Sequence, residues 1–199
     1  MKLFSIFDNN VFDKNKGFTL IELLVVATII GLLLALAVPN LIKARISANH
    51  ANAKKSLQVI RDAEWEFYQL DLNNDGIDNF TNIVGTLSDD NSLRCPDNPP
   101  CDSFDSLVDS SFENMETIGA SADCIDPYAG YCLKFSDEVT FSSIDVDFAW
   151  AVSPASVNKT GILDMVVFAD ATIRCSISTQ STNQQGQFQA TRSSHACID

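Results

Sequence analysis

The sequence predicts an α+β protein in which one long N-terminal helix packs against a small antiparallel sheet in a head with long irregular loops. Residues 18–38 form an apolar run, residues 39–70 continue with apolar residues at helical spacing, and three short C-terminal runs are rich in β-branched and aromatic residues. We therefore expect a leader (1–17), a transmembrane helix (18–38), an amphipathic helix continuation (39–70) and a globular extracytoplasmic head (71–199).

The apolar run has the length of a single membrane span. It reads FTLIELLVVATIIGLLLALAV, and its only charge is Glu22. A helix of this length extends about 31 Å, which matches a hydrocarbon core of about 30 Å. Lys14 and Lys16 ahead of the run favour a cytoplasmic N-terminus, although four basic residues follow the run on its other side (Lys43, Arg45, Lys54 and Lys55). A secretory signal peptide cleaved before Val38 is the alternative, but the polar leader, the length of the run and Glu22 argue against it.

The start of this run carries a recognisable motif. The segment Lys16-Gly17-Phe18-Thr19-Leu20-Ile21-Glu22 resembles the N-terminal signature of type IV pilins and of the pseudopilins of type II secretion systems. The resemblance covers about 25 to 30 residues. It implies that a prepilin peptidase cuts between Gly17 and Phe18 and methylates the new Phe18 amine.

Glu22 is the candidate assembly residue. A carboxylate inside a membrane helix costs on the order of 2.5–3.5 kcal/mol at the centre and less near the edge, so it normally has a partner. No Lys, Arg or His lies within the span, so we expect the partner on another molecule. The resemblance names the Phe18 amine of a neighbouring subunit. A carboxylate that only reaches back to the lipid headgroups is the alternative.

Gly31 and Pro39 are candidate helix-break residues. They occupy the fourteenth and twenty-second positions of the mature chain, where the family often carries the same residues. Proline removes a helical hydrogen bond, and glycine weakens a helix by about 1 kcal/mol relative to alanine. We expect a melted or kinked stretch between them, or an ordinary bend at the membrane exit.

The long helix should end where a cluster of turn residues begins. Asp71, Asn73, Asp75 and Gly76 match the first half of a calcium-binding loop, in which alternate oxygens converge on the ion. The last ligand position holds Asn82 in place of glutamate. Calcium is therefore a possible cofactor with Asp71, Asn73 and Asp75 as ligands, and a simple turn is the alternative.

All six cysteines follow the predicted membrane span, in the part expected to face an oxidising compartment. We expect disulfides, with a local pairing of neighbours along the chain as one of the fifteen connectivities. A zinc site is not expected, because no Cys-x2-Cys pair occurs and the two histidines are isolated in sequence. The cysteines are Cys95, Cys101, Cys124, Cys132, Cys175 and Cys197.

The head should contain three strands within irregular sequence. Residues 148–152, 163–169 and 171–177 read as strands, and the last two are close enough for a hairpin. Residues 81–147 read as a long insertion with little regular structure, and residues 178–192 read as a solvated loop.

Charge is divided unevenly along the chain. Residues 1–61 carry eight basic and three acidic side chains, whereas residues 62–199 carry five basic and 23 acidic ones. A nucleic-acid partner is not expected for such an acidic head, and its binding surface would be confined to a local patch such as Arg174 and Arg192. No nucleophile elbow, phosphate loop or histidine cluster occurs, so an enzyme is not expected either.

The remaining interpretation is structural. The resemblance implies a single-pass inner-membrane precursor that is surrounded by lipid before assembly. The assembly machinery of the inner membrane then packs it into a homo-oligomeric filament in the periplasm or on the cell surface. A type IV pilus-like subunit is the expected function, and a pseudopilin of a type II secretion system is the alternative.

Overall fold

The computed structural model describes residues 17–71, 76–88, 106–116, 126–136, 138–139, 144–180 and 185–197. The chain divides into two compact units, one ending at Leu41 and the other beginning at Ile42. The second unit contains the C-terminal half of the long helix together with the sheet.

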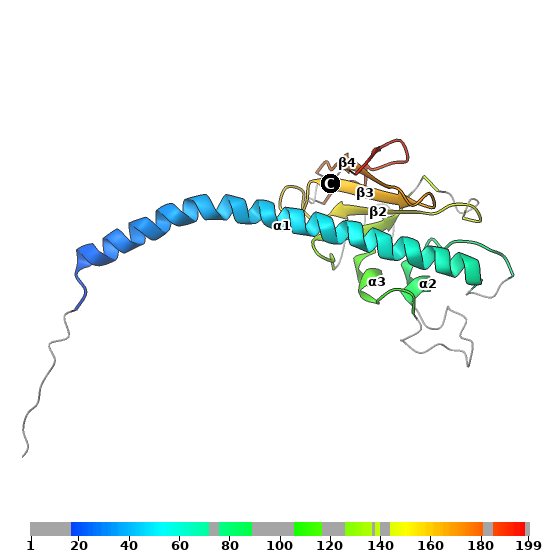
Figure 1. The fold of residues 1–199 in the computed structure, drawn as a ribbon, viewed down its shortest axis with the longest axis horizontal. Coiled ribbons are helices and arrows are strands. Elements are labelled where there is room, and N and C mark those ends of the chain that lie inside the picture. Colours follow the sequence, from blue (N-terminus) through cyan, green and yellow to red (C-terminus); the bar gives the residue numbers. More distant parts are fainter. Residues whose placement is uncertain are drawn as a thin grey trace, which may run out of the picture. The chain divides into compact units, whose positions relative to one another are not determined.

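The predicted α+β architecture is confirmed (Figure 1). The helices are α1 (Leu20–Leu70), α2 (Val84–Ser88) and α3 (Ser111–Met115). The strands are β1 (Tyr131–Phe135), β2 (Ala149–Pro154), β3 (Leu163–Phe168), β4 (Ile173–Ile177) and β5 (His195–Ala196).

Helix α1 runs without interruption from the apolar run into the head. In its second half the buried side chains recur at helical spacing and face the sheet, as the amphipathic pattern predicts. They are Ala53, Ser56, Leu57, Ile60, Ala63, Glu64 and Phe67. The apolar spacing expected over residues 39–70 extends beyond the buried face, because Ile42 near its start and Leu70 at its end are exposed.

Within the described residues the sheet has five antiparallel strands in the order β1-β2-β3-β4-β5, so the prediction of three strands is incomplete. The predicted hairpin is confirmed, with Val167 opposite Ile173 and Leu163 opposite Ile177. Strand β5 is only two residues long, and its pairing with β4 brings His195 opposite Cys175. Such a short strand leaves no periodic signal in the sequence.

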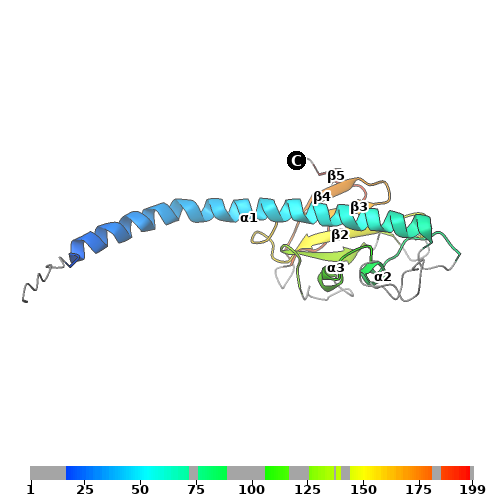
Figure 2. The same ribbon diagram turned by 60° about the horizontal axis from the view of Figure 1, so that its bottom comes forward.

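Helix α1 covers one face of the sheet (Figure 2). Alternate side chains of β2 and β3, including Trp150 and Met165, join the buried face of α1 in one apolar core. The ring of Phe80 stacks on Tyr68 at a centroid distance of 4.5 Å and meets Phe148 edge-on at 4.9 Å. These contacts hold the chain that leaves the end of α1 against the same core.

One carboxyl group lies inside this core. Glu64 is fully buried, and its Oε1 accepts the indole N–H of Trp150 at 2.6 Å while Oε2 accepts the backbone N–H of Thr81 at 3.0 Å. Burial raises the pKa of Glu64 to about 8, although both hydrogen bonds act in the opposite direction. Glu64 therefore joins α1, β2 and the segment before α2 at a single buried point.

The opposite face of the sheet has a second, smaller core. Val166 and Phe168 pack there with Ala190 and Phe188 from the C-terminal segment. The residues described between 178 and 192 include buried Ser178, Gln185 and Ala190, so the prediction of a solvated loop is wrong for this part. Polar composition misled the prediction, because the segment is held partly by hydrogen bonds to a buried carboxylate.

The buried carboxylate that holds the C-terminal segment belongs to Asp164 of β3. Its Oδ1 accepts the hydroxyl of Ser153 at 2.5 Å, and its Oδ2 accepts the backbone N–H of Gln189 at 2.8 Å. Burial raises the pKa of Asp164, and these hydrogen bonds oppose the rise. Gly186 lies so close that a Cβ there would overlap the hydroxyl oxygens of Ser153 and Ser178.

The insertion over residues 81–147 contains more regular structure than predicted. It includes α2, α3 and β1, and its short helices bury Val84, Leu87, Phe112 and Met115. Glu116 accepts the backbone N–H of Val84 at 3.2 Å and so connects the end of α3 to the start of α2. Each of these short helices buries two apolar residues that lie three positions apart. Such a pair is too short a pattern to reveal a helix within a polar stretch of sequence.

Candidate functional site

The predicted cleavage site lies just outside the helix. Gly17, Phe18 and Thr19 are not helical, and α1 begins at Leu20. The Phe18 side chain is 83% exposed. The peptide bond between Gly17 and Phe18 therefore lies in exposed, non-helical chain, which is the form of backbone that a peptidase can reach.

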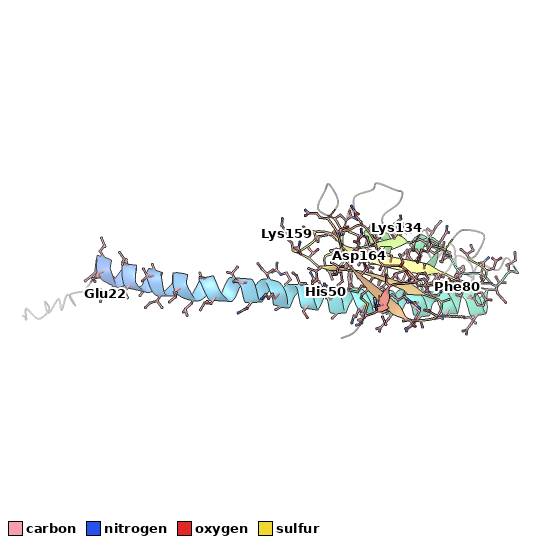
Figure 3. All side chains as sticks on the ribbon, turned by 90° about the horizontal axis from the view of Figure 1, so that it is seen from above. Glu22, His50, Phe80, Lys134, Lys159 and Asp164 are labelled. Carbon is pink, nitrogen blue, oxygen red and sulfur yellow. A yellow bond between two sulfur atoms is a disulfide. The ribbon has the colours of Figure 1, made fainter. Side chains whose placement is uncertain are left out.

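Glu22 lies in the first turn of α1 (Figure 3) and caps the start of the helix together with Thr19. Its Oε2 accepts the Thr19 backbone N–H at 2.8 Å and the Thr19 hydroxyl at 2.7 Å. The Glu22 backbone N–H donates to the Thr19 hydroxyl oxygen at 3.3 Å. This reciprocal pattern is a capping box, which satisfies N–H groups that the first turn of a helix leaves without partners.

The capping box corrects the expectation that Glu22 has no partner within its own chain. The partner is the uncharged Thr19, and a threonine three residues before a glutamate is the usual sequence signal of a capping box. Both Thr19 groups bind Oε2. Among the described residues nothing donates a hydrogen bond to Oε1, so this exposed oxygen can still accept one from another molecule.

The helix beyond the capping box exposes its apolar side chains. Every residue from Phe18 to Val38 is exposed, including Leu24, Ile29 and Leu33. By length and composition, α1 is one helix of the described chain that could cross a membrane. An apolar surface of this extent requires lipid or protein around it.

Gly31 and Pro39 do not break the helix, which corrects the prediction of a melted stretch. Residues 31–39 are helical, and Pro39 lies inside α1. The amide of Asn40 donates to the Leu36 carbonyl at 3.3 Å and so provides a side-chain hydrogen bond in the turn that contains the proline. No neighbouring atom lies within 4 Å of the position a Gly31 Cβ would occupy.

The candidate calcium ligands can be followed only in part. Asp71 ends α1 with a φ of 43°, and its Oδ2 accepts the backbone N–H of Gly76 at 3.2 Å. Asn73 and Asp75 lie outside the described residues. Within the described ranges no three His, Cys, Asp or Glu side chains gather as a metal site would require. Calcium binding at this loop stays a prediction.

One disulfide is defined. Cys175 of β4 and Cys197 are bonded, with their Cα atoms 5.1 Å apart, as the local pairing predicts. Cys132 is also disulfide-bonded. The other three cysteines, Cys95, Cys101 and Cys124, lie outside the described residues. The Cys175–Cys197 bond ties the C-terminal segment of the head to β4, beside the pairing of β4 with β5.

The patch that a nucleic acid would require is occupied by carboxylates. Arg174 forms an ion pair with Asp170 at 2.6 Å, and Arg192 forms one with Asp147. Both guanidinium groups also lie over the Phe168 ring, at 5.5 Å and 4.0 Å from its centroid. These arginines therefore pack against the second face of the sheet, and their charges are already balanced by carboxylates.

Comparison with known proteins gives the same assignment for the N-terminal segment. Residues 13–38 match the family described as the prokaryotic N-terminal methylation motif. The type IV major pilin protein PilA of Myxococcus xanthus is 39% identical over 72 residues, which are 36% of this chain and 31% of that protein.

Two further curated relatives are similar to part of the chain. The type IV narrow pilus major component PilA5 of Thermus thermophilus is 48% identical over 50 residues, covering 25% of this chain and 43% of that protein. The type II secretion system core protein G of Escherichia coli is 41% identical over 59 residues, covering 30% of this chain and 40% of that protein. The chain thus spans less than half the length of each of these curated relatives.

No solved structure matches the chain. The motif, the exposed apolar helix that follows it and the three curated relatives agree with one another. Residues 13–38 therefore carry the prokaryotic N-terminal methylation motif, and over part of its length the chain is similar to type IV pilins and to a type II secretion system core protein.

Proposed function

We propose that this chain is the precursor of a structural subunit of a type IV pilus-like filament. A prepilin peptidase removes residues 1–17 and methylates Phe18, and the mature subunits then assemble by packing their α1 helices together. The observation that carries the proposal is the exposed apolar half of α1, which starts directly after the cleavage motif and contains one carboxylate. Helices of neighbouring subunits would replace the lipid around this surface.

The geometry of Glu22 supports a specific step in assembly. Its Oε2 is held by Thr19, whereas Oε1 of this exposed side chain has no hydrogen-bond donor among the described residues. Cleavage creates a positively charged amine on Phe18 of each mature subunit. An amine of one subunit that binds Oε1 of the next would form a charge-assisted hydrogen bond in a surrounding of low dielectric constant.

A pseudopilin of a type II secretion system is the second candidate. The match to the core protein G of Escherichia coli favours it. The disulfide between Cys175 and Cys197, which closes a C-terminal loop in the manner of many pilins, favours the pilus subunit. Neighbouring genes for a retraction ATPase, or for a secretion apparatus with a secretin, would distinguish the two.

The proposal places the precursor in the inner membrane with its N-terminus in the cytoplasm and its head outside. The chain acts as a building unit without catalytic activity of its own, and its partners are the peptidase, the assembly machinery and further copies of itself.

Electron microscopy with an antibody against the head provides the test. Cells that carry the cognate machinery should shed antibody-labelled filaments on shearing, and cells without the prepilin peptidase should retain the uncut chain in the membrane. Normal filaments in cells that lack the peptidase, or a processed chain that never enters a filament, would contradict the proposal.

A further inference from the structure

The loop between β2 and β3 (residues 155–162) is joined to α1 by two consecutive residues of the helix. Asn49 Nδ2 donates a hydrogen bond to the Thr160 carbonyl at 2.8 Å. His50 Nε2 accepts the backbone N–H of Ile162 at 3.2 Å. The joined residues are 111 and 112 positions apart in sequence, so these contacts fix where the loop lies on the helix (Figure 3, where His50 is labelled).

These two contacts respond differently to acid. The side-chain amide of Asn49 does not titrate, so it donates its hydrogen bond in acid as well as at neutral pH. An imidazole nitrogen accepts a hydrogen bond while it carries no proton, whereas both ring nitrogens are donors in the protonated ring. Protonation of His50 therefore places a ring N–H against the N–H of Ile162, and the attraction between the two groups becomes a repulsion.

Tyr131 of β1 holds the imidazole ring and the loop in place beside each other. Its ring meets the ring of His50 edge-on at a centroid distance of 6.0 Å. Its hydroxyl donates to the Leu163 carbonyl at 3.0 Å, directly after the loop. A Cβ on Gly161 would overlap the Tyr131 hydroxyl oxygen, so the backbone of the loop packs closely on this side chain.

The side chains that share a groove with His50 offer a protonated ring no negative charge. His50 and Lys54 of α1 line this groove of about 640 Å³ together with His195 of β5, and none of the described residues that line it is acidic. The groove also contains Cys175 and Cys197, which are bonded to each other and do not titrate.

The remaining elements around His50 add two titratable groups. Burial raises the pKa of Tyr131, so its hydroxyl is uncharged in acid, and the loop itself carries one charged residue, Lys159. The pKa of His50 is lowered from its ordinary value of 6.5, first by burial and then by the positive charge of Lys54. The fold therefore favours the neutral ring, which is the form that accepts the Ile162 N–H.

We infer that His50 is a pH-sensitive switch whose protonation detaches the Ile162 end of the β2–β3 loop from α1. The contact is complete above the ordinary histidine pKa of 6.5 and is lost as the pH falls through the lower value of the folded chain. The bond between Asn49 and Thr160 does not titrate and keeps the rest of the loop on the helix. This inference concerns the head of a single chain and does not depend on the proposed function.

Nuclear magnetic resonance of the full-length chain in detergent micelles tests the switch. The ring resonances of His50 and the amide resonance of Ile162 should titrate together, with one midpoint below pH 6.5. Between about pH 8 and about pH 4.5 we expect the hydrogen-exchange protection of the Ile162 amide to fall at least about tenfold, after correction for the intrinsic exchange rates. Amides in the middle of β3, such as that of Val166, should keep their protection.

Two matched variants separate His50 from the other histidine of the groove. His50→Gln supplies a carbonyl oxygen that accepts the Ile162 N–H without titrating, so the protection of this amide should no longer depend on pH. His195→Gln removes the other imidazole and leaves the contact of His50 intact. This variant should keep the pH dependence of the native chain.

Three results would overturn the inference. The first is a His50 ring that stays neutral down to about pH 4.5. The second is a ring that titrates while the Ile162 amide keeps its protection. The third is a pH dependence that survives in His50→Gln or disappears in His195→Gln. The titration of the native chain decides the first two even where a variant fails to fold, and none of these results bears on filament assembly.

Discussion

The hydroxyl of Thr19 donates to Glu22 Oε2 at 2.7 Å and accepts the Glu22 backbone N–H at 3.3 Å, so each residue caps the other at the start of α1. The same carboxylate keeps Oε1 open to a partner on another molecule. Glu22 can therefore stabilise the helix terminus within one subunit and bind a neighbour during assembly.

The two roles of Glu22 can be separated by substitution. Glu22→Gln keeps a carbonyl oxygen that can accept from Thr19 but removes the charge, so we expect normal cleavage after Gly17 and little or no filament. Thr19→Ala keeps the charge and removes the cap, which costs about 1 kcal/mol of helix stability. We expect it to reduce filament yield far less than Glu22→Gln does.

The matched control for this pair is Thr28→Ala. Thr28 donates to the Val25 carbonyl at 2.8 Å in the middle of the same helical segment and takes no part in the cap. Filament yield should be close to native. Full assembly of the Glu22→Gln variant would show that the charge has no role.

The buried carboxyl of Glu64 should make the head less stable at alkaline pH. Its folded pKa of about 8 lies above the ordinary value of 4.5, so the folded state holds a proton that the unfolded state releases. Stability is then fully present below about pH 4.5 and falls as pH rises toward 8, by up to about 1.4 kcal/mol per pH unit.

Denaturant unfolding of the full chain in detergent, followed by tryptophan fluorescence from pH 5 to 8, measures this slope. Glu64→Gln should flatten most of it, and the remaining slope should have the same sign, because the pKa of Glu116 is also raised. An unchanged slope in Glu64→Gln would refute the assignment.

The disulfide between Cys175 and Cys197 should stabilise the C-terminal edge of the sheet. It closes a loop with a sequence separation of 22 residues, for which chain entropy predicts a contribution of about 3 kcal/mol. The double variant Cys175→Ser with Cys197→Ser should unfold at correspondingly lower denaturant concentration. An unchanged unfolding midpoint would mean that the pairing of β5 with β4 needs no covalent support.

Gly186 should tolerate no side chain. A Cβ at this position would overlap the hydroxyl oxygens of Ser153 and Ser178, so Gly186→Ala must displace the segment that covers the second face of the sheet. We expect a loss of about 1–3 kcal/mol in the free energy of unfolding.

Gly85→Ala is the matched control, because a Cβ there would meet its nearest atom at an ordinary distance of 3.6 Å inside helix α2. This variant should be neutral or slightly stabilising, since alanine favours helices. Equal effects at both glycines would contradict the packing described for Gly186.

Sequence patterns alone predict the helices and strands in which one physical signal dominates a long segment. The apolar run and the spacing from Ala53 to Phe67 predict α1, and the β-branched runs predict β2, β3 and β4. The cleavage motif can be identified without the structure, because its residues are adjacent in sequence.

The remaining features depend on contacts between distant residues. Glu64 lies among apolar positions of α1, and only Trp150 and Thr81, 86 and 17 residues away, explain why a carboxyl group is tolerated there. Likewise, Asp164 accepts a hydrogen bond from the backbone of Gln189 and so holds a polar C-terminal segment whose composition indicates a loop. The groove brings together His50 and His195, which are isolated in sequence.

The N-terminal residue of the protein recovered from sheared filaments tests the central claim most directly. Mass spectrometry of that N-terminal peptide should find a chain that begins at Phe18 and carries one methyl group on its amine. A chain that begins at Val38, or one that still carries the leader before Phe18, would contradict the account.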